Sequence, residues 1–198
     1  GKGTQALFAR IGGDVGTEHA WRLGVSRLKA KSARRSTTHN SATDLFTGTS
    51  ELTGVDVVWK WAPNGNPRER NFKFQAEYFT RDEDGSFDPA SAGTPLAYRG
   101  KQKGWYAQGI YQFVPRWRVG LRFDKLASDG VNAALAGTAL DNQGHSPGRR
   151  SLMLDYANSE FSRLRFQVNR DESRLNEKDT QLYLQYIMSL GAHGAHSF

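Results

Sequence analysis

Arg163-Leu164-Arg165-Phe166-Gln167-Val168-Asn169 is the stretch that decides the fold. Charged or amide side chains alternate here with apolar ones at every residue, which is the period of a β-strand with two different faces. Long polar side chains in mid-strand need water or charged partners. The stretch therefore predicts a strand that is polar on one side and apolar on the other.

The same period-two alternation recurs along the whole chain, and no segment with helical periodicity competes with it. Nine strands are predicted, which gives an all-β fold and a single domain over residues 1–198, arranged as an antiparallel up-and-down barrel. The predicted strands cover about residues 5–15, 20–31, 52–62, 71–81, 104–114, 117–126, 150–158, 161–171 and 180–198.

The predicted connections alternate between short and long. Short periplasmic turns and long outer loops are typical of outer-membrane barrels. A soluble meander has no reason to place all its long loops at one end. The short connections are 16–19, 63–70, 115–116 and 159–160, and the long polar ones are 32–50, 82–103, 128–149 and 172–179.

Composition restricts the class of protein further. Hydrophobic residues make up 37% of the 198-residue chain, and the mean hydropathy is −0.66. No window approaches the roughly 18 apolar residues of a membrane helix, whereas a membrane barrel keeps a low average because only alternate residues face lipid. The absence of cysteine excludes disulfides and thiol chemistry. A soluble β-sandwich or lipocalin-like barrel, with its apolar face inward, remains the alternative.

Large aromatic side chains occur near the ends of the predicted strands, on the apolar side of the alternation. Interfacial girdles of membrane barrels have this position, because ring faces are apolar while their N–H or O–H groups reach water. The predicted membrane-interface residues are Trp21, Trp61, Trp105, Trp117 and Phe198.

The last predicted strand ends at Phe198, in phase with Tyr186, Met188 and Leu190. This ending resembles the terminal strand of bacterial outer-membrane β-barrel proteins, and residues 185–198 look like the ending of porin-like or receptor-like members. The chain thus resembles the C-terminal portion of a porin-like barrel. The resemblance implies a place in the bacterial outer membrane, contact with its lipid and lipopolysaccharide, and recognition of the terminal strand by the barrel-insertion machinery.

The predicted strand number is odd, whereas single-chain bacterial barrels have even numbers with both ends in the periplasm. If the C-terminus is periplasmic, the first strand starts at the outer surface. We therefore expect this chain to be part of a larger barrel, such as the second half of one with sixteen to eighteen strands and about 400 residues. A ten-stranded barrel lacking one strand, or a receptor whose N-terminal plug lies elsewhere, is the alternative.

The polar side of the alternation supplies the candidate site. An excess of basic groups there predicts a channel that passes small polar solutes and favours anions. The alternatives are a plug-type receptor barrel for nutrient or metal uptake, and a structural or adhesive barrel whose lumen is filled by ion pairs. The predicted pore-lining residues are Arg10, Arg22, Lys60, Lys73, Glu77, Arg118, Arg122, Asp124, Asp155, Arg163 and Arg165.

Other chemistry is not expected. His193 and His196 would lie on opposite faces of a strand, so they predict no metal site. His145 and Ser146 are adjacent in a loop, which does not create a catalytic dyad, so neither an enzyme nor a cofactor is predicted. The basic 32–50 segment lacks interleaved aromatics, which argues against nucleic acid. Homo-oligomers are left open.

Overall fold

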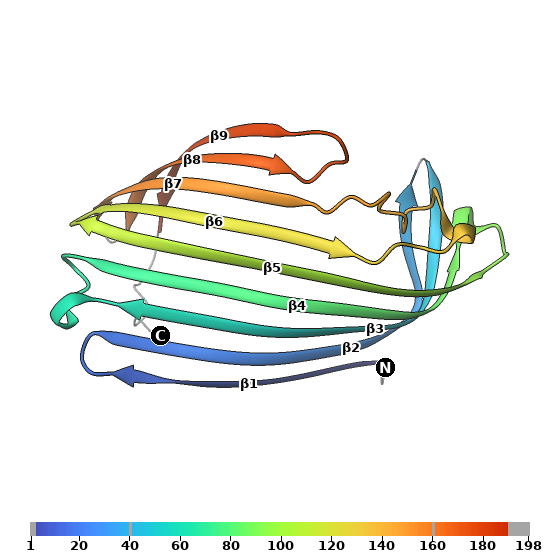
Figure 1. Ribbon diagram of the computed structural model, residues 1–198, viewed down its shortest axis with the longest axis horizontal. Helices are drawn as coiled ribbons and strands as arrows, with labels where there is room; N and C mark the ends of the chain where they lie inside the picture. The colour runs from blue at the N-terminus through green and yellow to red at the C-terminus, as the bar shows by residue number, and fades with distance from the viewer. Residues whose placement is uncertain (1–2, 40, 160, 190–198) are drawn as a thin grey trace.

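The computed structural model is one nine-stranded antiparallel sheet in which each strand pairs with the next one along the chain (Figure 1). It describes residues 3–39, 41–159 and 161–189. The predicted all-β, up-and-down arrangement is confirmed. The strands are β1 (Thr4–Val15), β2 (His19–His39), β3 (Ala42–Trp61), β4 (Asn71–Asp88), β5 (Leu96–Val114), β6 (Trp117–Ser128), β7 (Gly148–Ser159), β8 (Ser162–Glu172) and β9 (Asp179–Met188).

The sheet has two unpaired edge strands within the part of the chain that the structure describes. β1 pairs only with β2, and β9 pairs only with β8, so the sheet is not closed. No helix among the described residues is long and apolar enough to cross a membrane.

Successive connections alternate between the two ends of the sheet. The turns that join β1 to β2, β3 to β4 and β5 to β6 lie at one end of the sheet, which we call the short-turn end (Figure 1). The connections β2–β3, β4–β5 and β6–β7 lie at the opposite end, which we call the long-connection end after the β6–β7 connection, residues 129–147.

Two of the predicted long loops are wrong, because their residues are strands. β2 and β3 stay paired out to His39 and Ala42, and β4 and β5 stay paired out to Phe87 and Leu96. We call residues 32–50 and 82–100 the extension. The strand pairing continues into these segments, and Phe46, Phe87 and Tyr98 bury one another there.

The extension contains the core of the described residues. Phe46, Phe87 and Tyr98 are buried together with Leu135, which comes from the β6–β7 connection. The rings of Phe46 and Tyr98 meet edge to face, with centroids 5.9 Å apart. Asp44 is also buried, and its carboxylate accepts a hydrogen bond of 2.8 Å from the backbone N–H of Ala90. This end therefore packs as a soluble protein does.

The rest of the sheet presents an apolar face with nothing packed on it in the described residues. Its side chains are strongly exposed: Leu121 is 52% exposed and Leu184 is 74% exposed. The registers align such residues in rows, for example Trp21 opposite Trp59, and Trp59 opposite Phe74.

Towards the long-connection end, the same outward positions change from apolar to charged. On five strands, the first charged residue beyond the apolar band is basic and exposed, and we call this set the basic margin: Arg27, Lys103, Lys125, Arg150 and Arg170. On β3 and β4 the first charged residues are the acidic Glu51 and Asp82, and Glu51 forms an ion pair of 2.8 Å with Arg27. The apolar band thus stops short of the extension, and charged residues, most of them basic, lie between the two.

Candidate functional site

The candidate site is the second face of the sheet, which we call the polar face. The registers place all eleven predicted pore-lining residues on it. One row shows how this arises: Glu77 lies opposite Tyr106, Tyr106 opposite Asp124, and Asp124 opposite Arg149. Strand alternation and unshifted pairing over these residues bring the groups together.

Arg122 is the centre of one polar cluster. Its Nη2 donates to Asp124 at 2.6 Å, and its Nη1 donates to Gln108 Oε1 at 3.2 Å. Gln108 in turn donates to Gln75 at 2.8 Å. The guanidinium also lies 4.0 Å from the ring centroid of Tyr106, a cation–π contact. Arg122 is thereby held along the wall of the sheet instead of projecting freely from it.

Asp155 is the centre of a second cluster and is only 1% exposed. Arg165 donates to both of its carboxylate oxygens, at 2.7 and 2.9 Å, and Arg118 donates at 3.3 Å. A bidentate guanidinium–carboxylate pair has a fixed geometry. Two guanidinium groups share one carboxylate here, so the cluster keeps a positive excess.

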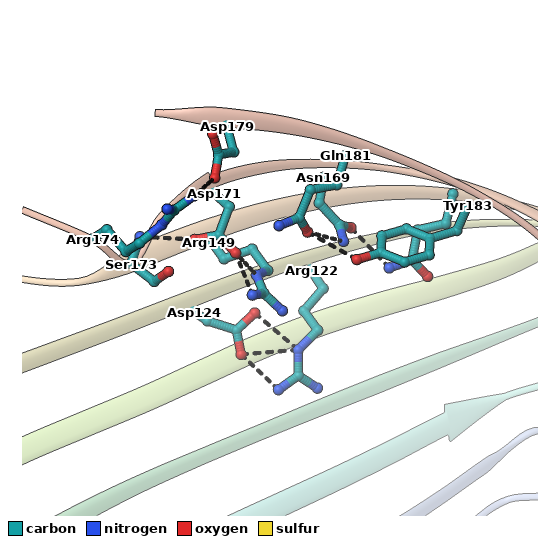
Figure 2. Close-up of polar contacts among 11 residues, drawn as sticks. Arg122, Asp124, Arg149, Asn169, Asp171, Ser173, Arg174, Asp179, Gln181 and Tyr183 are labelled. Atoms are coloured by element: carbon teal, nitrogen blue, oxygen red, sulfur yellow. Dashed lines mark hydrogen bonds and ion pairs between the residues drawn. The ribbon is translucent and has the colours of Figure 1, made fainter. Parts of the chain in front are cut away.

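A third cluster joins β7, β8 and the β8–β9 connection (Figure 2). Arg149 donates to Asp171, and the backbone N–H of Ser173 donates to the same carboxylate at 2.7 Å. Hydrogen bonds from Ser173 and then from Arg149 lower the pKa of Asp171 to about 2. Asp171 follows Arg170 of the basic margin, so it lies beyond the apolar band.

Basic groups oppose one another near the short-turn end. Lys60 and Lys73 are directly opposite on β3 and β4, and Arg163 lies two residues from Arg165 on the same side of β8. Among the described residues, neither Lys73 nor Arg163 forms an ion pair with a carboxylate. Like charges opposite each other in a sheet are destabilising. This end of the polar face therefore carries concentrated positive charge.

The predicted pore-lining set leaves out several members of the polar face. Arg149 was assigned to a loop, although it precedes Ser151 by two residues and so continues the polar alternation. Tyr106 and Gln108 also follow this alternation, and they hold Arg122. The signal for all three was the period of two.

Four predicted membrane-interface residues, Trp21, Trp61, Trp105 and Trp117, lie on the apolar face. Trp61 and Trp117 lie near the short-turn end, and Trp117 contacts Tyr156 with ring centroids 5.0 Å apart. Trp105 lies opposite Tyr78, nearer the basic margin. Their contact with a membrane stays a prediction, and Phe198 lies outside the described residues.

The histidine pair of the sequence analysis, His193 and His196, also lies outside the described residues. Within residues 3–39, 41–159 and 161–189, no group of three or more His, Cys, Asp or Glu side chains could hold a metal ion. The expectation that this protein uses no metal stays a prediction.

The chain is similar to two known proteins, and no family model matches it. An uncharacterized protein of Aquifex aeolicus (strain VF5) is 27% identical over 165 residues, covering 77% of this chain and 32% of that protein. The chain thus spans about a third of the relative's length. A solved structure of the NanC porin, in a rhombohedral crystal form, has a TM-score of 0.43 at 8% identity, covering 96% of this chain and 95% of that chain.

Proposed function

We propose that this chain is the membrane-spanning segment of a bacterial outer-membrane β-barrel channel, which passes small polar solutes and favours anions. One observation carries the proposal. A single antiparallel sheet has an apolar face that nothing in the described residues covers, while the opposite face holds its charged groups in networks. A soluble protein rarely exposes an apolar surface of this extent.

The exposure of apolar side chains on one face, and the burial of polar side chains on the other, support contact with lipid. A soluble sandwich or lipocalin-like barrel would turn the apolar face inward and cover it. Here Leu23, Val55 and Leu121 lie among exposed side chains, while Asp155 and Asn169 on the other face are buried. A membrane barrel has this arrangement, with apolar residues towards lipid and polar ones towards the lumen.

The unpaired edges of the sheet, β1 and β9, are part of the proposal. Unpaired backbone N–H and C=O groups cannot remain exposed to lipid, so β1 and β9 must pair with further strands. We propose that these strands belong to a larger even-stranded barrel, as the odd number of described strands favours.

The basic margin supports an orientation. Arg27, Lys125 and Arg170 point outward from the sheet at the long-connection end. In the outer leaflet, such side chains would meet lipopolysaccharide phosphates. The long-connection end is therefore proposed to face outward, with the short-turn end in the periplasm.

The proposed anion preference comes from the short-turn end of the polar face. Lys73 and Arg163 add positive charge there without an ion-pair partner in the described residues, and Lys60 faces Lys73. Rings of Lys and Arg favour anions in pores. Asp14 is a carboxylate of the same row, separated from Lys60 by Ala20, whereas Asp56 and Glu77 lie nearer to mid-strand.

The test uses the full-length protein in planar bilayers, with a salt gradient across the membrane. We expect ion conduction with a reversal potential on the anion side. Replacing both Lys73 and Arg163 by Gln should move that potential towards the cation side, whereas the exposed Arg99→Gln in the extension should leave it unchanged.

Three outcomes would contradict the proposal. A cation-side reversal potential for the unaltered protein removes the anion preference. Absence of conduction, together with absence of liposome swelling in small sugars, would favour a filled lumen. A protein that is monodisperse in buffer without detergent is not a membrane barrel.

A further inference from the structure

The polar face changes character as it approaches the extension. Leu28 lies opposite Leu52, and one row further Phe79 lies opposite Gly104, which lies opposite Leu126. All of these positions are in phase with the charged residues of the polar face, because they differ from them by even steps along their strands. A channel for polar solutes alone does not require such apolar side chains on this face.

Gly104 allows these side chains to form one continuous apolar surface, which we call the floor. A Cβ at this position would lie 2.4 Å from Cζ of Phe79 and 2.8 Å from Cδ2 of Leu126. The ring of Phe79 therefore lies across β5, above the glycine, and reaches towards Leu126. Any larger residue at Gly104 would push the ring away, so the glycine fits a built apolar surface.

A cavity of about 740 Å³ lies over this floor. Leu175 of the β8–β9 connection and His145 of the β6–β7 connection also line it, so walls from three parts of the chain meet there. Pockets that bind small molecules usually have volumes of about 300–1,000 Å³ and mainly apolar linings with a few polar groups. The size and lining fit one small organic molecule.

The cationic side chains Arg81 and Lys103 outnumber the one carboxylate that lines the cavity, Asp141, whose two oxygens each accept a backbone hydrogen bond of 2.9 Å, and this balance favours a negatively charged ligand. Arg81 lines it, donates to Ser50 Oγ at 3.0 Å and forms an ion pair with Glu83. Glu83 is also bound by Arg35 at 2.6 Å, so two guanidinium groups share one buried carboxylate. The side-chain amide of Gln102, beside Arg81, has no hydrogen-bond partner among the described residues.

We propose that this cavity binds amphipathic carboxylates, with the apolar or aromatic body on the Phe79 floor and the carboxylate near Arg81 and Gln102. The inference goes beyond passage of polar solutes, since it assigns a binding site to the mouth of the lumen. The inference rests on the proposed function in one respect: the experiment below holds the protein in a lipid membrane.

The experiment is isothermal titration of the full-length protein in phosphatidylcholine nanodiscs, with empty nanodiscs as the reference. The probes are phenylbutyrate and its uncharged counterpart phenylbutanol. We expect the acid to bind, and the alcohol to bind about tenfold more weakly, since a charge-assisted contact is lost. No binding of the acid, or equal binding of both probes, overturns the proposal.

Two variants separate the floor from the charged group. Phe79→Ser should weaken both probes by at least about tenfold, because a large ring leaves the floor. Arg81→Gln should weaken the acid by about tenfold and leave the alcohol unchanged. The matched controls are Ile110→Ser, which removes an apolar group elsewhere on the polar face, and the exposed Arg99→Gln.

Other results also decide the question. If Arg81→Gln makes the extension sensitive to protease, Gln102→Ala replaces it and should also weaken the acid selectively. Unchanged affinity for the acid in the Phe79 and Gln102 variants overturns the site. If another segment of the full-length protein fills the cavity, no probe binds and the proposal fails, while conduction in bilayers still tests the channel separately.

Discussion

The apolar face and the extension share strands β2 to β5, yet apolar side chains are exposed on the apolar face and buried in the extension. On β3, Phe46 is 2% exposed whereas Val55 is 49% exposed. On β4, Phe87 is 3% exposed whereas Tyr78 is 45% exposed. The extension therefore has a core of its own, and the remaining sheet lacks one among the described residues.

The difference arises because the apolar phase changes face along each strand. From Val55 to Trp61 the apolar side chains of β3 occupy odd positions, apart from the buried Val58, while Phe46 and Leu52 occupy even ones. The β3–β4 pairing continues without a shift from Leu45 to Trp61, so no bulge causes the change. One regular sheet thus presents apolar groups outward in the band and inward in the extension, which suits lipid around one part and water around the other.

The largest expected effect is in the core of the extension. Phe46→Ala should destabilise the extension by about 3–5 kcal/mol, since truncation of a buried Phe loses burial and leaves a cavity. The measurement is native-state proteolysis of the extension, which reports the free energy of local opening.

The matched control on the apolar face is Phe123→Ala, where the ring is 45% exposed. It should leave protease cleavage of the extension unchanged. Equal protection of the extension in Phe46→Ala and in the unaltered protein would show that the two regions do not differ in packing.

The next effect tests what surrounds the apolar face. Leu121→Arg should cost about 2–4 kcal/mol when the protein folds into lipid vesicles, because the charge would lie in mid-band. Thr80→Arg, at the edge marked by Arg27 and Lys103, should cost less than about 1 kcal/mol. Folding titrations in urea measure both. A cost for Leu121→Arg below about 0.5 kcal/mol, relative to the unaltered protein, would indicate a water-exposed surface.

The comparison also shows what the sequence can predict about the fold. Alternation placed β8 at residues 161–171, and the structure has Ser162–Glu172. The extension was assigned to loops because its sequence is mostly polar, and its few apolar residues, such as Phe46, are out of phase with Val55 and its neighbours. Recognising it requires following each strand through a change of face, with Phe87 and Tyr98 as partners that only the fold brings together.

The sequence predicts which residues lie on the polar face, but it does not predict which of them bind one another. Arg163, Arg165 and Asp155 share the polar face because of strand alternation alone. That Asp155 binds both Arg165 and Arg118 depends on the registers of β6, β7 and β8. Those registers follow from turn geometry and cross-strand packing, which the spacing along the chain does not determine.

The smallest expected effect concerns the polar cluster beyond the basic margin. The pKa of Asp171, about 2, lies below its ordinary value of 3.8, so the ionised form stabilises the folded state. This contribution is complete above pH 4 and is lost as the pH falls from about 4 to about 2. Asp171→Asn should therefore be less stable than the unaltered protein at pH 5, and the difference should shrink at pH 2. Urea midpoints at both values measure it, and a difference that does not change with pH would show that ionisation of Asp171 does not stabilise the β8–β9 connection.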